Sequence, residues 1–152
     1  MTKITASEVN KLRKQTGAGM MDCKKALVEA GGNFDEAVDI LRKKGQKVAA
    51  KRADRETSEG VVLSMTSSDN KFGAVMSLKC ETDFVAKNSD FVMLASDIIK
   101  LGLKNKVTNT KNLKSLKFNS EITVDEKLTE QTGVIGEKIE LSNFKFIEAE
   151  YV

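Results

Sequence analysis

The sequence predicts an α+β protein with a three-helix bundle at its start, a helical linker, and a small antiparallel sheet covered by helices. Three observations predict this fold class. Apolar residues with helical spacing, interrupted by glycines, occupy the first 45 residues. Two runs with the two-residue period of a strand follow, over residues 60–66 and 72–80, and a long helical apolar stripe over residues 89–103 can cover the resulting sheet. We therefore expect a bundle over residues 1–45, a linker over residues 46–58 and an α+β core subdomain over residues 59–152.

Composition excludes several classes of function. The 152 residues include 25 Lys and Arg against 22 Asp and Glu, and the net charge of +3 is too small to indicate nucleic-acid binding by itself. The absence of histidine, with Cys23 and Cys80 far apart, argues against a zinc site, a catalytic triad and histidine acid–base chemistry. No apolar run approaches the roughly 18 residues of a membrane span, and the first residues lack the apolar core of a signal peptide. We expect no cofactor, no metal and a reducing, cytoplasmic compartment.

The first helix has a recognisable start. Thr5 and Glu8 have the spacing of a capping box, in which each side chain bonds to the backbone of the other residue. We expect a helix over residues 6–15 that ends at Thr16-Gly17-Ala18-Gly19, where glycine permits a left-handed backbone. Its inward residues are Val9 and Leu12.

Glycines and an asparagine delimit the next two helices. Gly31-Gly32 is expected to stop the second helix, and Asn33 to cap the third. Gly45 suits the position just after the third helix. Residues 46–56, basic and rich in alanine, are then interpreted as a helical connector whose charges face solvent, with a phosphate- or acid-binding stripe as the alternative. The inward residues of the second and third helices are Ala26, Leu27, Ala30, Phe34, Ala37, Val38 and Leu41.

The second half of the chain begins with a hairpin pattern. The alternating runs over residues 60–66 and 72–80 flank the turn cluster of residues 67–71, which predicts a β-hairpin. The helix over residues 89–103 should cover it. Its buried residues should be Phe91, Leu94, Ala95, Ile98, Ile99 and Leu101.

The remaining segments have weaker patterns. Residues 105–120 contain only Leu113 and Leu116 as signs of a helical turn, whereas Thr123 and Glu126 form another capping box. Gly133 and Gly136 are expected to bracket the end of that helix. Residues 138–152 alternate as one strand or two. The alternation shifts at Ser142-Asn143, which indicates a bulge.

The turn between the predicted hairpin and its covering helix is the candidate contact loop. Asp83 and Phe84 stand side by side there, and turns at strand ends commonly present binding groups from a rigid scaffold. The residues alone favour a turn or helix-entry position for Asp83 and a core position for Phe84. No phosphate-binding glycine motif occurs, and helix dipoles explain adjacent carboxylates such as Asp35 and Glu36.

Two sequence runs closely resemble the bacterial translation elongation factor Ts family. One extends from Ile4-Thr5-Ala6-Ser7 to Gly17-Ala18-Gly19-Met20-Met21-Asp22-Cys23, and continues to residue 27. The other is Thr82-Asp83-Phe84-Val85-Ala86-Lys87, in the same order and at the expected separation. Gly136-Glu137-Lys138-Ile139 is similar to a third family stretch, more weakly. The resemblance covers residues 4 to about 141.

The resemblance implies a non-enzymatic guanine-nucleotide exchange factor for the GTPase elongation factor Tu, binding its GDP-bound and nucleotide-free forms. It implies a ubiquitin-associated-like bundle followed by an α+β core. Thr82, Asp83, Phe84 and Val85 would disturb Mg²⁺ binding in the partner, with Phe84 between two of its helices and therefore exposed in this chain. The residues Gly17, Gly19, Met20 and Met21 of the bundle would contact the GTPase domain separately. For Met20 and Met21, we also expect that at least one fills the bundle core.

Family members continue beyond the length of this chain, which stops within a β pattern. We expect that the chain is a fragment and that an open C-terminal edge could pair with another copy to form a homodimer. One alternative function is a protein-binding module without exchange activity. Another is a nucleic-acid binder that uses the lysines of residues 43–55 and 104–117, although no aromatic stacking platform accompanies them.

Overall fold

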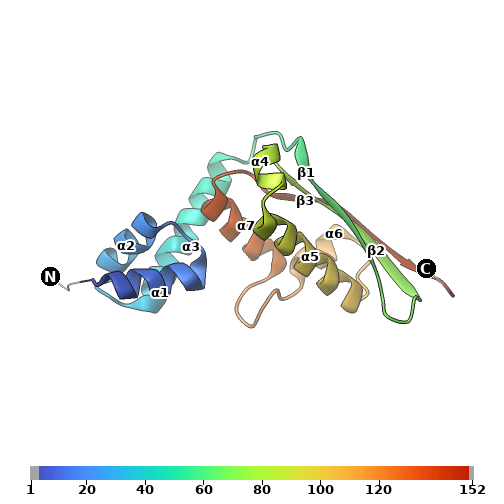
Figure 1. Ribbon diagram of the computed structural model, residues 1–152, viewed down its shortest axis with the longest axis horizontal. Helices are drawn as coiled ribbons and strands as arrows, with labels where there is room; N and C mark the ends of the chain where they lie inside the picture. Colours follow the sequence, from blue (N-terminus) through green and yellow to red (C-terminus); the bar gives the residue numbers. More distant parts are fainter. Residues whose placement is uncertain (1–3, 151–152) are drawn as a thin grey trace. The chain divides into compact units, whose positions relative to one another are not determined.

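The computed structural model describes residues 4–150, and in this range the chain forms seven helices and one three-stranded sheet (Figure 1). The predicted α+β class, with helices first and a small sheet after them, is confirmed. The chain divides into two compact units. The first unit consists of the chain up to Ala53 together with Thr129–Gly136. The second consists of Asp54–Leu128 and the chain from Glu137 onward.

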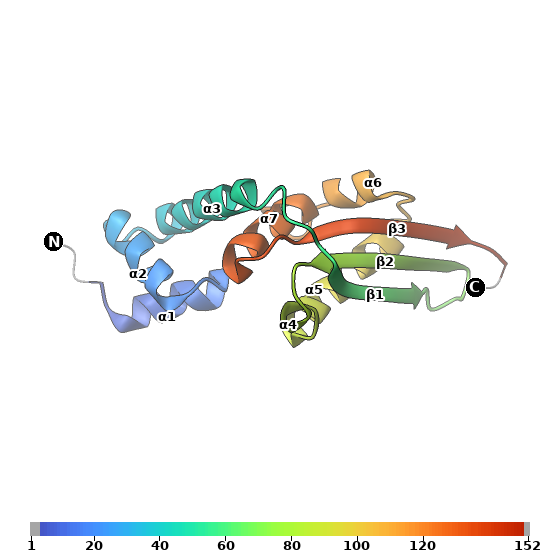
Figure 2. The same ribbon diagram turned by 90° about the horizontal axis from the view of Figure 1, so that it is seen from above.

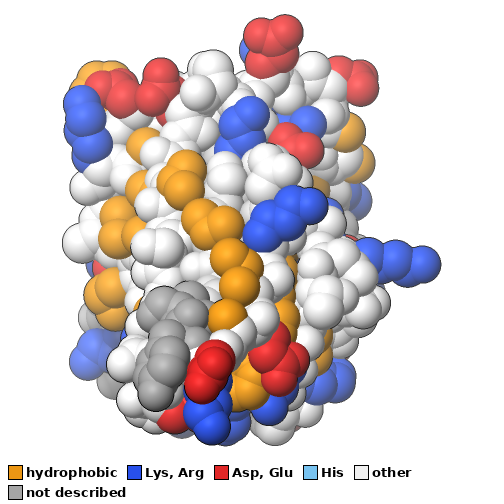
Figure 3. Space-filling model, turned by 90° about the vertical axis from the view of Figure 1, so that its right-hand side faces the viewer, with side chains coloured by type: hydrophobic (Ala, Val, Ile, Leu, Met, Phe, Trp, Pro, Cys, Tyr) orange, Lys and Arg blue, Asp and Glu red, His pale blue; other side chains and the backbone are white. Residues whose placement is uncertain are grey.

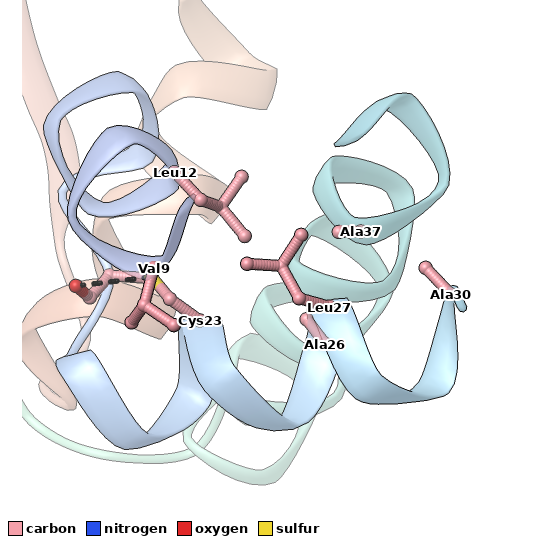
Figure 4. Packing of buried hydrophobic residues seen from close by; sticks show 8 residues of the cluster. Val9, Leu12, Cys23, Ala26, Leu27, Ala30 and Ala37 are labelled. Carbon is pink, nitrogen blue, oxygen red and sulfur yellow. Dashed lines mark hydrogen bonds between the residues drawn. The ribbon is translucent and has the colours of Figure 1, made fainter. Parts of the chain in front are cut away.

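The first unit is built on α1 (Ala6–Thr16), α2 (Met20–Glu29) and α3 (Phe34–Lys51). The capping box is confirmed, because the Glu8 carboxylate accepts from the Thr5 backbone N–H at 2.7 Å and Thr5 Oγ1 accepts from the Glu8 N–H at 3.3 Å. Asn33 caps α3 as predicted. Small and branched side chains from the three helices meet in one core (Figure 4). The buried members are Val9, Leu12, Ala18, Cys23, Ala26, Leu27, Ala30 and Ala37.

The predicted helix end at Gly45 is wrong, since α3 continues through it to Lys51. Gly45 is buried against Gly133, which lies in the last turn of α7 (Val124–Ile135); the prediction that Gly133 and Gly136 bracket the end of this helix is confirmed, because α7 ends at Ile135. A Cβ atom on Gly133 would collide with the Gly45 backbone. These two glycines therefore allow α3 and α7 to pack closely within the first unit. Gly136, with φ 80°, does follow the helix.

The sheet of the second unit contains β1 (Glu59–Thr66), β2 (Phe72–Cys80) and β3 (Glu140–Glu148) in the order β1-β2-β3, all antiparallel. The predicted hairpin is confirmed by the β1–β2 pairing. The predicted bulge is confirmed as well, because Leu141 pairs with Leu78 and Asn143 with Ser77, which leaves Ser142 extra. The start of the chain at residues 1–3 and the last two residues of the predicted final strand lie outside the described residues.

Helix α5 (Ser89–Lys104) packs on one face of this sheet, with the short helices α4 (Asp83–Ala86) and α6 (Thr110–Ser115) beside it (Figure 2). The predicted buried residues of α5 are confirmed except Leu101, which is half-buried, while Leu103 is buried. The alternate residues of the strands point away from α5. Among them Val62, Val75 and Ile147 are exposed. Figure 3 shows hydrophobic side chains reaching the surface between lysines and acidic residues.

Candidate partner-binding site

The turn after β2 is built as one tight helical turn. After Cys80 the chain bends at Glu81, is extended at Thr82 with φ −123° and ψ 155°, and then forms α4. The N–H groups of Ala86 and Lys87 donate to the carbonyl oxygens of Thr82 at 3.2 Å and Asp83 at 3.0 Å. Asn88 next caps α5 by accepting from the Asp90 N–H at 2.8 Å. The turn is thus fixed at both ends by secondary structure.

Phe84 is the most exposed large apolar side chain among the described residues, with 84% of its surface accessible. Its exposure, implied by the family resemblance, is confirmed. Ala86, two residues further, is buried beneath the same turn. A large aromatic side chain usually gains by burial, so the exposed ring of Phe84 is a candidate contact for another molecule.

Asp83 lies beside Phe84 and forms an ion pair with Lys87. The distance from Lys87 Nζ to Asp83 Oδ2 is 2.7 Å. This hydrogen bond, together with charge attraction, lowers the pKa of Asp83 and raises the pKa of Lys87. Both groups are therefore charged at neutral pH, and the ring of Phe84 projects beside a paired acid and base.

Thr82 and Val85, the other predicted contact residues of this loop, are half-buried, as Asp83 also is. The Thr82 hydroxyl donates to Glu137 Oε1 at 2.6 Å, so it is engaged within the protein. The structure thus presents Asp83 and Phe84, and uses Thr82 as an anchor.

Glu137 is the residue of this site that sequence reasoning missed as a contributor. Its Oε2 accepts from the backbone N–H groups of Glu81 at 3.1 Å and Thr82 at 3.0 Å, in addition to the Thr82 hydroxyl bond. In return, Glu81 Oε1 accepts from the Lys138 N–H at 2.7 Å. The only signal in the sequence was the weak Gly-Glu-x-Ile resemblance, which does not say what Glu137 contacts.

Cys80 lies under the turn and is fully buried. Its thiol donates to the Thr82 carbonyl at 3.2 Å. Burial raises the pKa of Cys80 to about 11, and the negative charge of Glu137 adds to the rise. The group is therefore a neutral thiol at physiological pH and supports the turn without being a nucleophile.

The second predicted contact set lies at the α1–α2 turn of the first unit. Gly17 adopts φ 72° after α1 and donates its N–H to the Arg13 carbonyl at 2.8 Å, whereas Gly19 has an ordinary φ of −61° just before α2. Met20 and Met21 are 39% and 62% exposed. The expectation that one of them fills the bundle core is therefore wrong, and the buried residue at the start of α2 is Cys23.

Within residues 4–150, no three Cys, Asp or Glu side chains are grouped so that they could hold a metal ion. Over the same residues, no helix combines the length and apolar character that crossing a membrane requires.

Comparison with known proteins shows what the chain is similar to. Residues 81–152 match the family model described as Elongation factor TS. Over all 152 residues the chain is 59% identical to elongation factor Ts of Christiangramia forsetii, 57% to that of Flavobacterium johnsoniae and 53% to that of Flavobacterium psychrophilum. The matches cover 54%, 47% and 54% of these relatives, so the chain spans about half the length of the curated relatives it matches.

The relatives are all elongation factors Ts by name. The chain is similar to them over its whole length, and its residues 81–152 match the family model. The family resemblance seen in the sequence is thereby confirmed.

Proposed function

We propose that this chain acts in translation elongation as a guanine-nucleotide exchange factor that promotes GDP release from elongation factor Tu. The observation that carries the proposal is the 84% exposure of Phe84 on a turn held by hydrogen bonds at both of its ends. The Asp83–Phe84 pair would enter between helices of the GTPase. Thr82 and Val85 complete the contact loop.

A rigid ring suits this task for a physical reason. An aromatic side chain has few rotamers, so it buries a large area on a partner at a small entropic cost. Burial of an exposed phenylalanine is worth about 1.5–3 kcal/mol. The Mg²⁺ ion of a nucleotide-bound GTPase bridges phosphate oxygens and is held by few protein groups. A small shift of the GTPase helices would therefore weaken its coordination, without a reactive group from this chain.

Thermodynamic linkage determines which nucleotide state of the GTPase the chain should prefer. An exchange factor binds the nucleotide-free GTPase more tightly than the GDP-bound form, and GDP then weakens its binding by the same factor. Each tenfold of that factor corresponds to about 1.4 kcal/mol. We therefore assign both nucleotide states of elongation factor Tu as partners, with the nucleotide-free state preferred.

The α1–α2 turn provides a second proposed contact. Met20 and Met21 expose flexible apolar side chains at the start of α2, next to Gly17 and Gly19. Val28, about two helical turns after Met21, is also 60% exposed. This apolar surface would hold the GTPase independently of the Phe84 loop. It also supports the alternative function, a bundle that binds a protein partner without any effect on nucleotide release.

Two further features belong to the proposal. We place the protein in the cytoplasm, with no direct role for nucleic acid. Strand β3 stands at one edge of the described sheet, so its unpaired backbone groups could join a second copy as a homodimer. Sedimentation at rising protein concentration measures such association.

Release of fluorescently labelled GDP from elongation factor Tu, with and without this chain, tests the function. The wild-type chain should accelerate release, and Phe84→Ala should remove most of the acceleration while leaving the fold intact. Val62→Ala, which shortens another exposed apolar side chain, is the matched control and should behave like wild type. Binding of the GTPase without acceleration of release would favour the alternative function.

A further inference from the structure

Two glutamates on segments far apart in the chain, Glu81 and Glu137, each accept a backbone N–H of the other's segment beside the Phe84 loop. Glu137 accepts three hydrogen bonds, from the Glu81 N–H, the Thr82 N–H and the Thr82 hydroxyl, at 3.1, 3.0 and 2.6 Å. Glu81 Oε1 accepts the Lys138 N–H at 2.7 Å. All these bonds involve a carboxylate, and such charge-assisted bonds are stronger than neutral ones.

The location of these bonds determines what they fix. Thr82 is the residue just before α4, and its side chain makes no capping bond to that helix. The exposed ring of Phe84, two residues later, has little protein around it to hold its direction. The orientation of the ring therefore depends on the backbone of Glu81 and Thr82, and the Glu137 carboxylate is the group that holds both of their N–H groups.

We propose that Glu137 is a positioning residue, which holds the turn so that Phe84 projects in one fixed direction before a partner arrives. When the turn is already ordered, binding does not have to include the entropic cost of ordering it. The binding-competent conformation is then the dominant one in the free chain. This inference deepens the proposed exchange function and rests on it for its biological meaning. The positioning itself is a property of the isolated chain and can be measured there.

A tryptophan introduced in place of Phe84 reports on the turn directly. The chain contains no tryptophan, so Phe84→Trp gives a single-tryptophan protein whose time-resolved fluorescence anisotropy follows the motion of this side chain. In this background, Glu137→Ala should at least double the amplitude of the fast, local depolarisation. Glu137→Gln keeps the size and one acceptor oxygen, and should lie between the wild type and the alanine variant.

A matched variant separates positioning from general stability. Glu140 lies three residues from Glu137 and also accepts a side-chain hydrogen bond, from Thr57 Oγ1 at 2.8 Å, but it does not bond to the turn. Glu140→Ala should leave both the anisotropy of the introduced indole and the GDP-release rate unchanged. With Phe84 in place, Glu137→Ala should slow stimulated GDP release about tenfold at subsaturating concentration, as expected when strong hydrogen bonds are lost.

The outcomes are distinct. Unchanged anisotropy of the introduced indole in Glu137→Ala, or wild-type GDP release despite a mobile indole, would overturn the positioning role. If Glu137→Ala does not fold, Thr82→Val decides, because it removes only the 2.6 Å hydroxyl bond. A folded Thr82→Val protein with increased local motion supports the inference, and one with unchanged motion overturns it. If the wild-type chain does not accelerate GDP release from elongation factor Tu, the proposed exchange function is wrong. The anisotropy of the introduced indole still decides whether Glu137 holds the turn.

Discussion

The carboxylate of Glu137 accepts the hydroxyl hydrogen of Thr82 at 2.6 Å, although 55 residues separate the two in the sequence. This contact joins the segment before β3 to the end of β2, the central strand of the sheet. The exposed ring of Phe84 follows directly. The candidate site therefore depends on tertiary structure for its shape, while the residues that would touch a partner are consecutive in the sequence.

Phe84 and Phe91 are seven residues apart and should respond to mutation in opposite ways. Phe84 is 84% exposed and Phe91 is 1% exposed. Phe84→Ala should change the free energy of unfolding by no more than about 0.5 kcal/mol, as is usual for surface positions. Phe91→Ala should cost about 3–5 kcal/mol, because it leaves a cavity between α5 and the sheet. Urea denaturation followed by circular dichroism measures both, and similar losses in the two variants would contradict the exposure of Phe84.

Local signals in the sequence were sufficient for most of the elements. The capping residues Thr5 and Asn33 predicted helix starts because a cap involves only neighbouring residues. The alternation in β1 and β2 predicted their pairing, and the shift in alternation at Ser142 predicted the bulge. Each of these features is determined within a few residues of chain.

The remaining features depend on contacts that a sequence does not display. Gly45 was interpreted as a helix end. In a sequence, a glycine that ends a helix cannot be distinguished from a glycine inside a helix that allows another helix to pack closely. The partner of Gly45, Gly133, lies on another helix. For the same reason Glu137 could not be assigned to the turn that it holds. Phe84 alone would have suited a core position, and only the family resemblance indicated exposure.

The pKa of Glu8 should report on the first capping box. The Thr5 backbone N–H, and then the Thr5 hydroxyl, lower the pKa of Glu8 below its ordinary value of 4.5. A carboxylate with a lowered pKa stabilises the folded state above the pKa of the unfolded chain, and this contribution is lost as the pH falls through the folded-state pKa. Carbon-13 NMR titration should show Glu8 titrating below 4.5.

Substitution of Thr5 provides the control for that titration. Thr5→Ala removes the hydroxyl but keeps the backbone N–H, so the pKa of Glu8 should rise only part of the way toward 4.5. A wild-type Glu8 that titrates at 4.5 or above would show that the capping box does not persist in solution.

Cys80 should be unreactive in the folded protein. Its pKa of about 11 leaves roughly one thiolate in a thousand molecules at pH 8, and the side chain is also buried. Burial raises the pKa of Cys23 as well. A thiol reagent that produces a coloured product should therefore label neither cysteine quickly at pH 8, but both after addition of denaturant. Rapid labelling of Cys80 in the native protein would mean that the turn opens above it.

The raised pKa of Cys80 also predicts a dependence of stability on alkaline pH. A thiol whose folded-state pKa exceeds its unfolded value of 9.0 stabilises the fold fully below that value, and the contribution is lost as the pH rises toward about 11. Cys80→Ala should lose part of this alkaline sensitivity. Urea midpoints at pH 7 and pH 10 measure the difference, and equal pH dependence in the two proteins would exclude Cys80 as a contributor.

Gly45 and Gly133 should differ sharply in their tolerance of alanine. A Cβ atom at Gly133 would collide with the backbone of Gly45, so Gly133→Ala must force the two helices apart and should cost about 1–3 kcal/mol. A Cβ atom at Gly45 would lie 3.5 Å from the Thr129 carbonyl oxygen, which is ordinary contact. Because alanine favours a helix interior, Gly45→Ala should be neutral or up to about 1 kcal/mol more stable. Thermal unfolding of the two variants measures this asymmetry, and equal destabilisation would mean that the helices cross elsewhere.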